Sequence, residues 1–263
     1  MLAEIYSKIS KSGSNLSERL EDKLTGDFFG TIRYLPFELG LKQVLTTTDF
    51  THKQAEQKWM KFIEKEKGFA TQIEFWYRDD EGEIDLLITT EKMIIGIEVK
   101  YLSGISSEDH SEEIAIDYRE SVHQLARYSR MIERLSKGRK SYLLFLAPYD
   151  MMNQVKKKVL ERPIIAPTVE IGFISWQDIH ESLLTLDISN IEIGPQRIIK
   201  DLRALLKIKG LMQFNGFNSP VFLQLVTKEA YSFNGEYFIN QTAFNWPSKF
   251  IKEDEKYVYN YSN

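Results

Sequence analysis

The sequence predicts an α/β fold in which helices flank a central sheet. Three consecutive segments of strand length lie between residues 70 and 99, and segments with helical and strand periodicity then alternate as far as residue 175. The 263 residues are enough for one large domain or two modest ones. We expect residues 1–175 to form the core domain and residues 176–263 to form an accessory region, helical and rich in aromatic residues.

The expected elements follow the order helices, three strands, helix, strand, helix, strand, with an αβββαβ core. Apolar residues four apart after Asn15 predict a first helix over residues 16–33, and an apolar stripe predicts a second over residues 51–67. Strands are expected at residues 70–78, 84–89, 93–99, 141–147 and 169–174. Further helices are expected at residues 112–136 and 151–160, from Ser175 or Trp176 onward, and at residues 197–209.

The composition excludes several classes of protein. With 38 acidic and 34 basic residues the formal charge is −4, so the chain does not bind polyanions through bulk positive charge. The absence of cysteine excludes disulfide frameworks, thiolate zinc sites, iron–sulfur clusters and a cysteine nucleophile, and it suits a reducing cytoplasm. No apolar run approaches the ~18 residues of a membrane span, and the N-terminal residues lack a signal-peptide core. We therefore expect a cytoplasmic protein.

The chemistry is expected in the hairpin formed by residues 84–89 and 93–99. A turn centred on Glu91 and Lys92 places Asp85 directly across from Glu98, with their Cβ atoms ~4.5–5.5 Å apart on one face. Lys100 shares this face because side chains alternate along a strand. The apolar residues between these positions are expected to turn to the opposite face: Ile84, Leu86, Ile88, Ile95, Ile97 and Val99. Gly96, opposite Leu87, is expected to leave the acidic face uncrowded.

Two carboxylates that face each other on otherwise apolar strands repel, and their removal from water adds a further cost. A cation between Asp85 and Glu98 resolves this, and oxygen ligands favour Mg²⁺, or Mn²⁺, over zinc. Lys100 is well placed either to stabilise charge on a phosphorane or to orient and deprotonate the attacking water. The alternative is an ordinary ion pair of Lys100 on a solvated sheet, which the apolar character of both strands disfavours.

The pattern Asp85 … Glu98-Val99-Lys100 resembles the PD-(D/E)xK nuclease superfamily, which has the restriction-endonuclease-like fold. The resemblance covers about residues 16–175, and Ile84 stands at the proline position, a common variation. The resemblance implies that Asp85, Glu98 and the carbonyl of Val99 bind the metal and that Lys100 is the catalytic lysine.

Such nucleases often carry a glutamate on the first core helix. On a helical wheel Glu21 borders the buried face, whereas Glu18 and Asp22 lie toward solvent. Glu21 is therefore the candidate for a third carboxylate of the catalytic and metal-binding set.

Gln124 and Tyr128 lie four residues apart on one face of the expected 112–136 helix. This spacing resembles the Gln-x-x-x-Tyr motif of RecB-type and lambda-exonuclease-type members, in which the glutamine lies by the active site. We expect Gln124 to position the water or a phosphate. The missing cysteines exclude the iron–sulfur subgroup of RecB-type relatives.

Basic and histidine residues elsewhere allow two interpretations, phosphate contact or an ordinary solvated surface. The second is favoured for the group on the 112–136 helix, because its other side should pack on the sheet: Arg119, His123, Arg127, Arg130 and Arg134. Other candidate patches are Lys156, Lys157 and Lys158, and Arg197, Lys200 and Arg203. His110 is better explained as a loop residue than as a substrate contact, and His52 and His180 have no supporting neighbours.

The sequence therefore predicts a Mg²⁺-dependent nuclease that hydrolyses phosphodiester bonds of DNA, in restriction, phage defence or repair. Two alternatives stay open: a non-cleaving nucleic-acid-binding or assembly subunit, and an RNA nuclease. A homodimer or a partner protein is plausible, because cleavage of both strands needs two sites.

Overall fold

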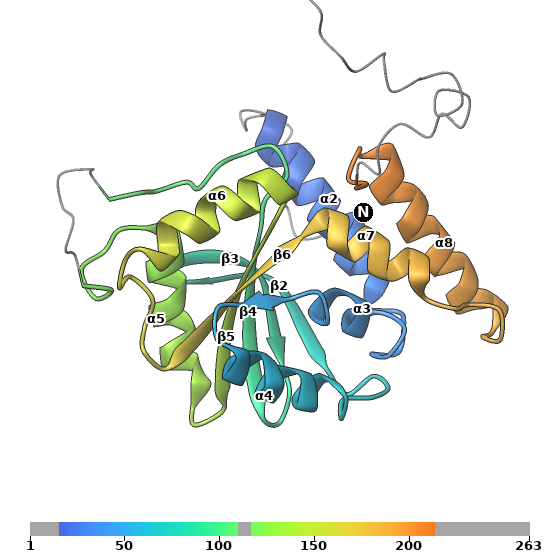
Figure 1. The fold of residues 1–263 in the computed structure, drawn as a ribbon, viewed down its shortest axis with the longest axis horizontal. Coiled ribbons are helices and arrows are strands. Elements are labelled where there is room, and N and C mark those ends of the chain that lie inside the picture. Colours follow the sequence, from blue (N-terminus) through green and yellow to red (C-terminus); the bar gives the residue numbers. More distant parts are fainter. Residues whose placement is uncertain (1–15, 110–116, 214–263) are drawn as a thin grey trace, which may run out of the picture. The chain divides into compact units, whose positions relative to one another are not determined.

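The computed structural model describes residues 16–109 and 117–213, with Leu16–Arg19 described by their backbone alone (Figure 1). Contacts divide the chain into two units, Met1–Phe214 and Asn215–Asn263. His110, the first residues of the helix expected over residues 112–136, and the aromatic residues beyond 213 lie outside the described residues. The expected division into a core domain of residues 1–175 and an accessory region of residues 176–263 stays a prediction.

The described residues form the predicted α/β architecture around one mixed six-stranded sheet. Its strands are β1 (Asp49–Phe50), β2 (Gln72–Asp79), β3 (Gly82–Thr89), β4 (Met93–Val99), β5 (Lys140–Ala147) and β6 (Val169–Ser175). They are ordered β1-β6-β5-β4-β3-β2. β4, β5 and β6 are parallel to one another, whereas β2, β3 and β1 pair antiparallel to their neighbours. β4 thus joins a local hairpin to a parallel sheet.

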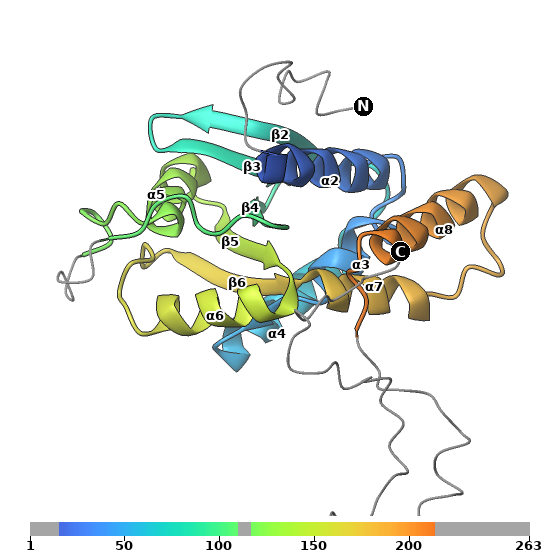
Figure 2. The same ribbon diagram turned by 90° about the horizontal axis from the view of Figure 1, so that it is seen from above.

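Helices cover both faces of the sheet. α5 (Gln124–Ser136) and α6 (Tyr149–Leu160) pack on one face, where Leu125, Ile132 and Val155 are buried (Figure 1). The other face is covered by α2 (Leu16–Ile32), α3 (Leu41–Leu45), α4 (Lys53–Ile63), α7 (Trp176–Thr185) and α8 (Ile193–Ile208). α2 runs beside α8, although the two are far apart in the chain (Figure 2). None of the helices at 16–109 and 117–213 has the length and apolarity needed to cross a membrane.

The β3–β4 hairpin has the predicted register. Leu86 pairs with Ile97 and Leu87 with Gly96, and the turn closes with a bond from the Thr90 amide to the Met93 carbonyl at 3.0 Å. The same register, extended by one residue, brings Asp85 opposite Glu98.

The expected orientation of Ile84 is wrong. Ile84 packs with Leu87 and α5, on the face opposite to Leu86. The β2–β3 pairing passes from Phe75↔Leu86 to Tyr77↔Ile84 and omits Trp76, whose φ is +50°. This interruption lies opposite Asp85, and it changes the face to which Ile84 turns.

The acidic face is not uncrowded at Gly96. A Cβ atom there would lie 2.6 Å from Ile84 Cδ1 and 2.7 Å from Ile132 Cδ1. The glycine instead allows α5 to approach the sheet closely.

The helix expected over residues 112–136 begins only at Gln124, after the N-cap His123. Residues 117–123 are not helical, because Asp109 accepts hydrogen bonds from the Ser121 hydroxyl (2.7 Å) and the Val122 amide (2.8 Å). These bonds hold the chain as a loop and place the first turn of α5 at the end of β4.

Candidate active site

The site lies where β3 and β4 carry two carboxyl groups at the edge of the apolar core. Glu98 is buried, with 2% of its surface exposed, and Asp85 is half-buried. Asp85 Oδ2 accepts a hydrogen bond from the Val99 amide at 2.8 Å, which fixes the aspartate against β4. The adjacent strands thus hold both carboxyl groups by their backbones.

Burial raises the pKa of Asp85 well above its ordinary value, and the Glu98 carboxylate raises it further. The pKa of Glu98 is also raised by burial, although Lys100 acts in the opposite direction. The two groups resist simultaneous ionisation in this site. A cation bound between them would relieve that cost.

Lys100 supplies the positive charge that the structure places beside these groups. Its Nζ lies 2.8 Å from Glu98 Oε1 and 3.3 Å from Glu21 Oε1, and 6% of the residue is exposed. Burial lowers the pKa of Lys100, but Glu98, Glu21 and Asp85 raise it by more, so the pKa lies above its ordinary value. Lys100 is therefore an ammonium at neutral pH.

Glu21 reaches the site from α2, on the inward side of the helix as the wheel predicts. It is buried, and its Oε2 accepts from the Tyr101 amide at 2.8 Å and from the Ser103 hydroxyl at 2.6 Å. Its other oxygen faces Lys100. Glu21 thus contacts the lysine and the segment that follows it, rather than Asp85 or Glu98.

Gln124 and Tyr128 meet the site from α5. Gln124 Nε2 donates to Glu98 Oε1 at 2.7 Å and to the Tyr128 hydroxyl oxygen at 3.1 Å, while its Oε1 accepts from the Ser106 amide at 3.1 Å. The Tyr128 hydroxyl in turn donates to the Glu83 carbonyl. Gln124 therefore connects the carboxylate of Glu98 to the loop after β4.

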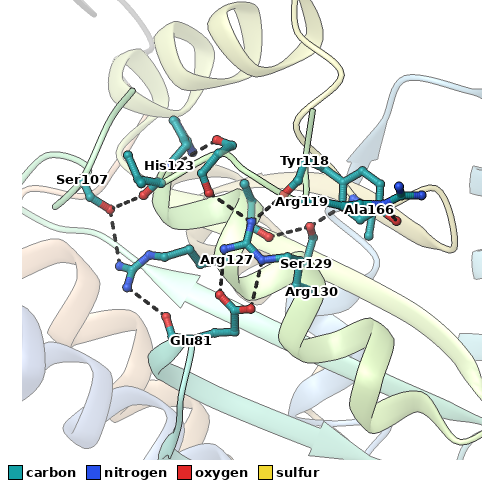
Figure 3. Close-up of polar contacts among 12 residues, drawn as sticks. Glu81, Ser107, Tyr118, Arg119, His123, Arg127, Ser129, Arg130 and Ala166 are labelled. Carbon is teal, nitrogen blue, oxygen red and sulfur yellow. Dashed lines mark hydrogen bonds and ion pairs between the residues drawn. The ribbon is translucent and has the colours of Figure 1, made fainter. Parts of the chain in front are cut away.

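The arginines of α5 are engaged in contacts within the protein (Figure 3). Arg130 donates to both carboxylate oxygens of Glu81 at 2.9 and 2.7 Å, and to the carbonyls of Tyr118 and Ser121. Arg127 donates to the Glu81 carbonyl at 2.9 Å, and Arg134 pairs with Asp79. These contacts tie α5 to the β2–β3 hairpin. They agree with the interpretation that this group is not a phosphate-binding surface.

The remaining basic and histidine candidates lie apart from the carboxyl groups. His123 is buried, and its Nδ1 accepts from the Leu125 amide, so it caps α5. Arg119 is exposed beside the Tyr118 ring. On α6, Lys156 pairs with Asp49 and Lys158 with Glu108, and Arg203 of α8 donates to the Leu183 carbonyl of α7. The other candidates are exposed, except for the buried His180: Lys157, Arg197, Lys200 and His52.

The residues at the site fit an oxygen-ligated divalent cation. Asp85 and Glu98 are two carboxyl donors whose buried charge is incompletely balanced, and the groups that shift their pKa values include no histidine. Within residues 16–109 and 117–213, no group of three or more His, Cys, Asp or Glu side chains is arranged around a common ion position. A cation held here would have Asp85 and Glu98 as its side-chain ligands, with backbone carbonyls or water completing the set.

Sequence reasoning missed Ser103 and Trp176. The Trp176 indole donates to the Lys100 carbonyl at 2.9 Å, from the first residue of α7. Trp176 lies at the start of the helix expected after the strand at residues 169–174, which predicts its place at one end of the sheet, but no local pattern ties it to Lys100. Ser103 carries no signal beyond its closeness to Lys100 in the chain.

Comparison with protein-family models gives a match for part of the chain. Residues 51–157 match the family model of the nuclease-related domain, NERD, and they include Asp85, Glu98, Lys100 and Gln124. Searches of curated proteins and of solved structures found no match. Residues 51–157 therefore match a nuclease-related domain, a domain that belongs to the PD-(D/E)xK restriction-endonuclease-like superfamily.

Proposed function

We propose that the protein is a metal-dependent nuclease that hydrolyses phosphodiester bonds of DNA. The observation that carries the proposal is the pairing of half-buried Asp85 with buried Glu98, with the Lys100 ammonium 2.8 Å from Glu98. Buried carboxyl groups with unbalanced charge destabilise a fold, so a ligand that uses their charge explains their presence.

Asp85, Glu98 and the Val99 carbonyl would hold Mg²⁺, for which Mn²⁺ could substitute. When bound, such an ion supplies a Lewis acid and lowers the pKa of a water molecule. The Val99 amide holds Asp85, and Gln124 holds Glu98, so the chain itself orients both carboxylates. We keep Glu21 as a candidate third acidic residue of this set.

Lys100 would stabilise the negative charge that develops on the phosphate. An ammonium, such as the one paired here with Glu98 and Glu21, has no lone pair with which to take a proton from water, and this favours charge stabilisation over the role of a base. Gln124 would orient Glu98, and through it the water or the phosphate.

The setting of the reaction follows from analogy alone. DNA as substrate, a role in restriction, phage defence or repair, a homodimer or partner protein, and a cytoplasmic location all remain part of the proposal. Residues 1–175 would carry the nuclease core.

Cleavage of supercoiled plasmid tests the proposal. We expect nicking or linearisation with Mg²⁺ and none with EDTA, and we expect Lys100→Ala and Glu98→Gln to abolish it. Lys23→Ala is the matched control, because Lys23 is an exposed α2 residue paired with Asp27 and should leave cleavage unchanged. Circular dichroism confirms that each variant is folded.

The same assay separates the alternatives. Cleavage of RNA but not of plasmid would replace the substrate. Binding of DNA without cleavage, together with no Mg²⁺ binding in a calorimetric titration, would support a non-cleaving subunit and would overturn the enzyme proposal.

A further inference from the structure

Lys100 lies one residue beyond the end of β4, yet its backbone is held from three sides. The Lys100 amide donates to the Leu146 carbonyl of β5 at 2.7 Å. The Lys100 carbonyl accepts from the Trp176 indole at 2.9 Å, and the Tyr101 amide donates to Glu21 at 2.8 Å. Three successive polar groups of the backbone are thus bonded to β5, α7 and α2.

These bonds fix the backbone dihedrals of Lys100 and hence the direction of its Cα–Cβ bond. A lysine side chain has four rotatable bonds, so its ammonium is held in place only when its origin and its end are both fixed. Glu98 and Glu21 hold the end at 2.8 and 3.3 Å. The hydrogen bond from the Trp176 indole to the Lys100 carbonyl helps to fix the backbone from which the side chain starts.

Trp176 is placed for this contact by the start of α7. Ser175 caps the helix by accepting from the Asp178 amide, and Trp176, the first helical residue, is fully buried. Its ring packs edge-on against Phe28 of α2, with ring centroids 5.1 Å apart. Phe28 lies two helical turns from Glu21, on the same side of α2. Trp176 therefore contacts both the backbone of Lys100 and the helix that holds its ammonium.

We infer that Trp176 is a positioning residue for Lys100, supplied by a helix outside the nuclease-related match. The inference rests on the proposed function for its catalytic meaning. A second contact supports it: the Tyr101 hydroxyl donates to the Lys209 carbonyl, just after α8, at 3.0 Å. α7 and the end of α8 thus both hold the segment that begins at Lys100.

Trp176→Phe tests the inference, with Trp59→Phe as the matched control. Trp59 is equally buried, and its indole donates to the Leu45 carbonyl at 2.8 Å, outside the site. Both substitutions remove one buried indole donor and should lower the melting temperature comparably. Only Trp176→Phe should shift the ¹³Cε–¹⁵Nζ NMR signal of Lys100, which is assigned by its loss in Lys100→Arg. It should also lower kcat about tenfold with KM for DNA unchanged.

A Lys100 signal that moves no more in Trp176→Phe than in Trp59→Phe would overturn the inference. If Trp176→Phe does not fold, β-(3-benzothienyl)alanine at position 176 keeps the ring shape without the N–H donor, and the same comparison applies. Absence of cleavage by the wild-type protein would count against the proposed function, whereas the Lys100 signal would still decide on Trp176.

Discussion

Lys100 has three carboxyl groups around it, those of Asp85, Glu98 and Glu21. This excess of acidic over basic groups makes the site costly to bury. Lys100 contacts Glu98 and Glu21 directly, and the raised pKa of Asp85 reflects its burial and the nearby Glu98. Groups that are costly to bury and are needed for function lower stability. The cost should be measurable by removing a single charge.

Asp85→Asn should stabilise the metal-free protein by about 0.5–2 kcal/mol near neutral pH. Because burial and Glu98 raise the pKa of Asp85, the folded state retains a proton there that the unfolded chain loses at lower pH. Wild-type stability at this group therefore falls as pH rises above the ordinary aspartate pKa. Thermal melting in EDTA at about pH 5 and pH 8 should show a larger gain at the higher pH.

Asp187→Asn is the control, because the pKa of Asp187 is shifted in the opposite direction to that of Asp85. Asp187 is exposed and accepts from the Ser189 amide, which lowers its pKa. Its substitution should bring no gain at either pH. A metal-free Asp85→Asn protein that melts below the wild type at pH 8 would contradict the argument.

At the scale of elements, the contact between α5 and the sheet depends on Gly96. Gly96→Ala should cost about 1–3 kcal/mol, because its Cβ would lie 2.6–2.7 Å from the Cδ1 atoms of Ile84 and Ile132. Adding Ile84→Val and Ile132→Val removes both Cδ1 atoms and should recover part of this loss. Chemical denaturation measures each step, and Gly194→Ala, which meets no atom within 4 Å, is the control. Equal effects of the two alanines would exclude close packing as the cause.

The ion pairs of Arg130 with Glu81 and of Arg134 with Asp79 join α5 to the β2–β3 hairpin. Arg130→Ala should lower the free energy of unfolding by about 2–3 kcal/mol, because the charged pair with Glu81 is largely buried. Arg134→Ala, at a more exposed pair, should cost less than about 1 kcal/mol. DNA affinity and its salt dependence should be unchanged in both. Weaker binding by Arg130→Ala with normal unfolding would restore a phosphate-contacting role.

Local patterns predicted the elements because the forces that determine them are local. The turn at Glu91 and Lys92 sets the β3–β4 register, so the Asp85–Glu98 juxtaposition follows from the sequence. The early start expected for α5 was wrong, because Asp109 binds the backbone of the loop before it. The orientation expected for Ile84 was wrong because the pairing of β2 with β3 is interrupted at Trp76.

At the scale of the whole molecule, the support of Lys100 comes from helices that lie far from it in the sequence, on both sides. Glu21 arrives from α2 and Trp176 from α7, and no periodicity or spacing within the chain encodes which helices meet. Glu21 could be predicted because the apolar residues of its own helix show which side is buried, whatever element packs against that side. The contact with Trp176 required the tertiary fold.

Truncation separates the two expected parts of the chain. A chain of residues 1–213 should keep a cooperative thermal transition, whereas residues 1–175 should not. The shorter chain loses a buried apolar set that packs with α2: Trp176, Ile179, Leu183, Ile199, Leu202, Leu206 and Leu211. Circular dichroism melting distinguishes the outcomes. A cooperative transition in residues 1–175 would support an independent core that ends at that residue.

The sequence distances within the site imply an order of assembly. The Asp85–Val99 contact spans 14 residues, whereas the contacts of Lys100 with Glu21 and Trp176 span 79 and 76. Short loops close first, so the acidic hairpin should form before the lysine is anchored. In pulsed hydrogen exchange during refolding, amides of β3 and β4 should gain protection before the amide of Tyr101, which Glu21 holds. A partly folded chain would then have Asp85 and Glu98 in place before Lys100 is ordered. Activity would be delayed until α2 and α7 have docked.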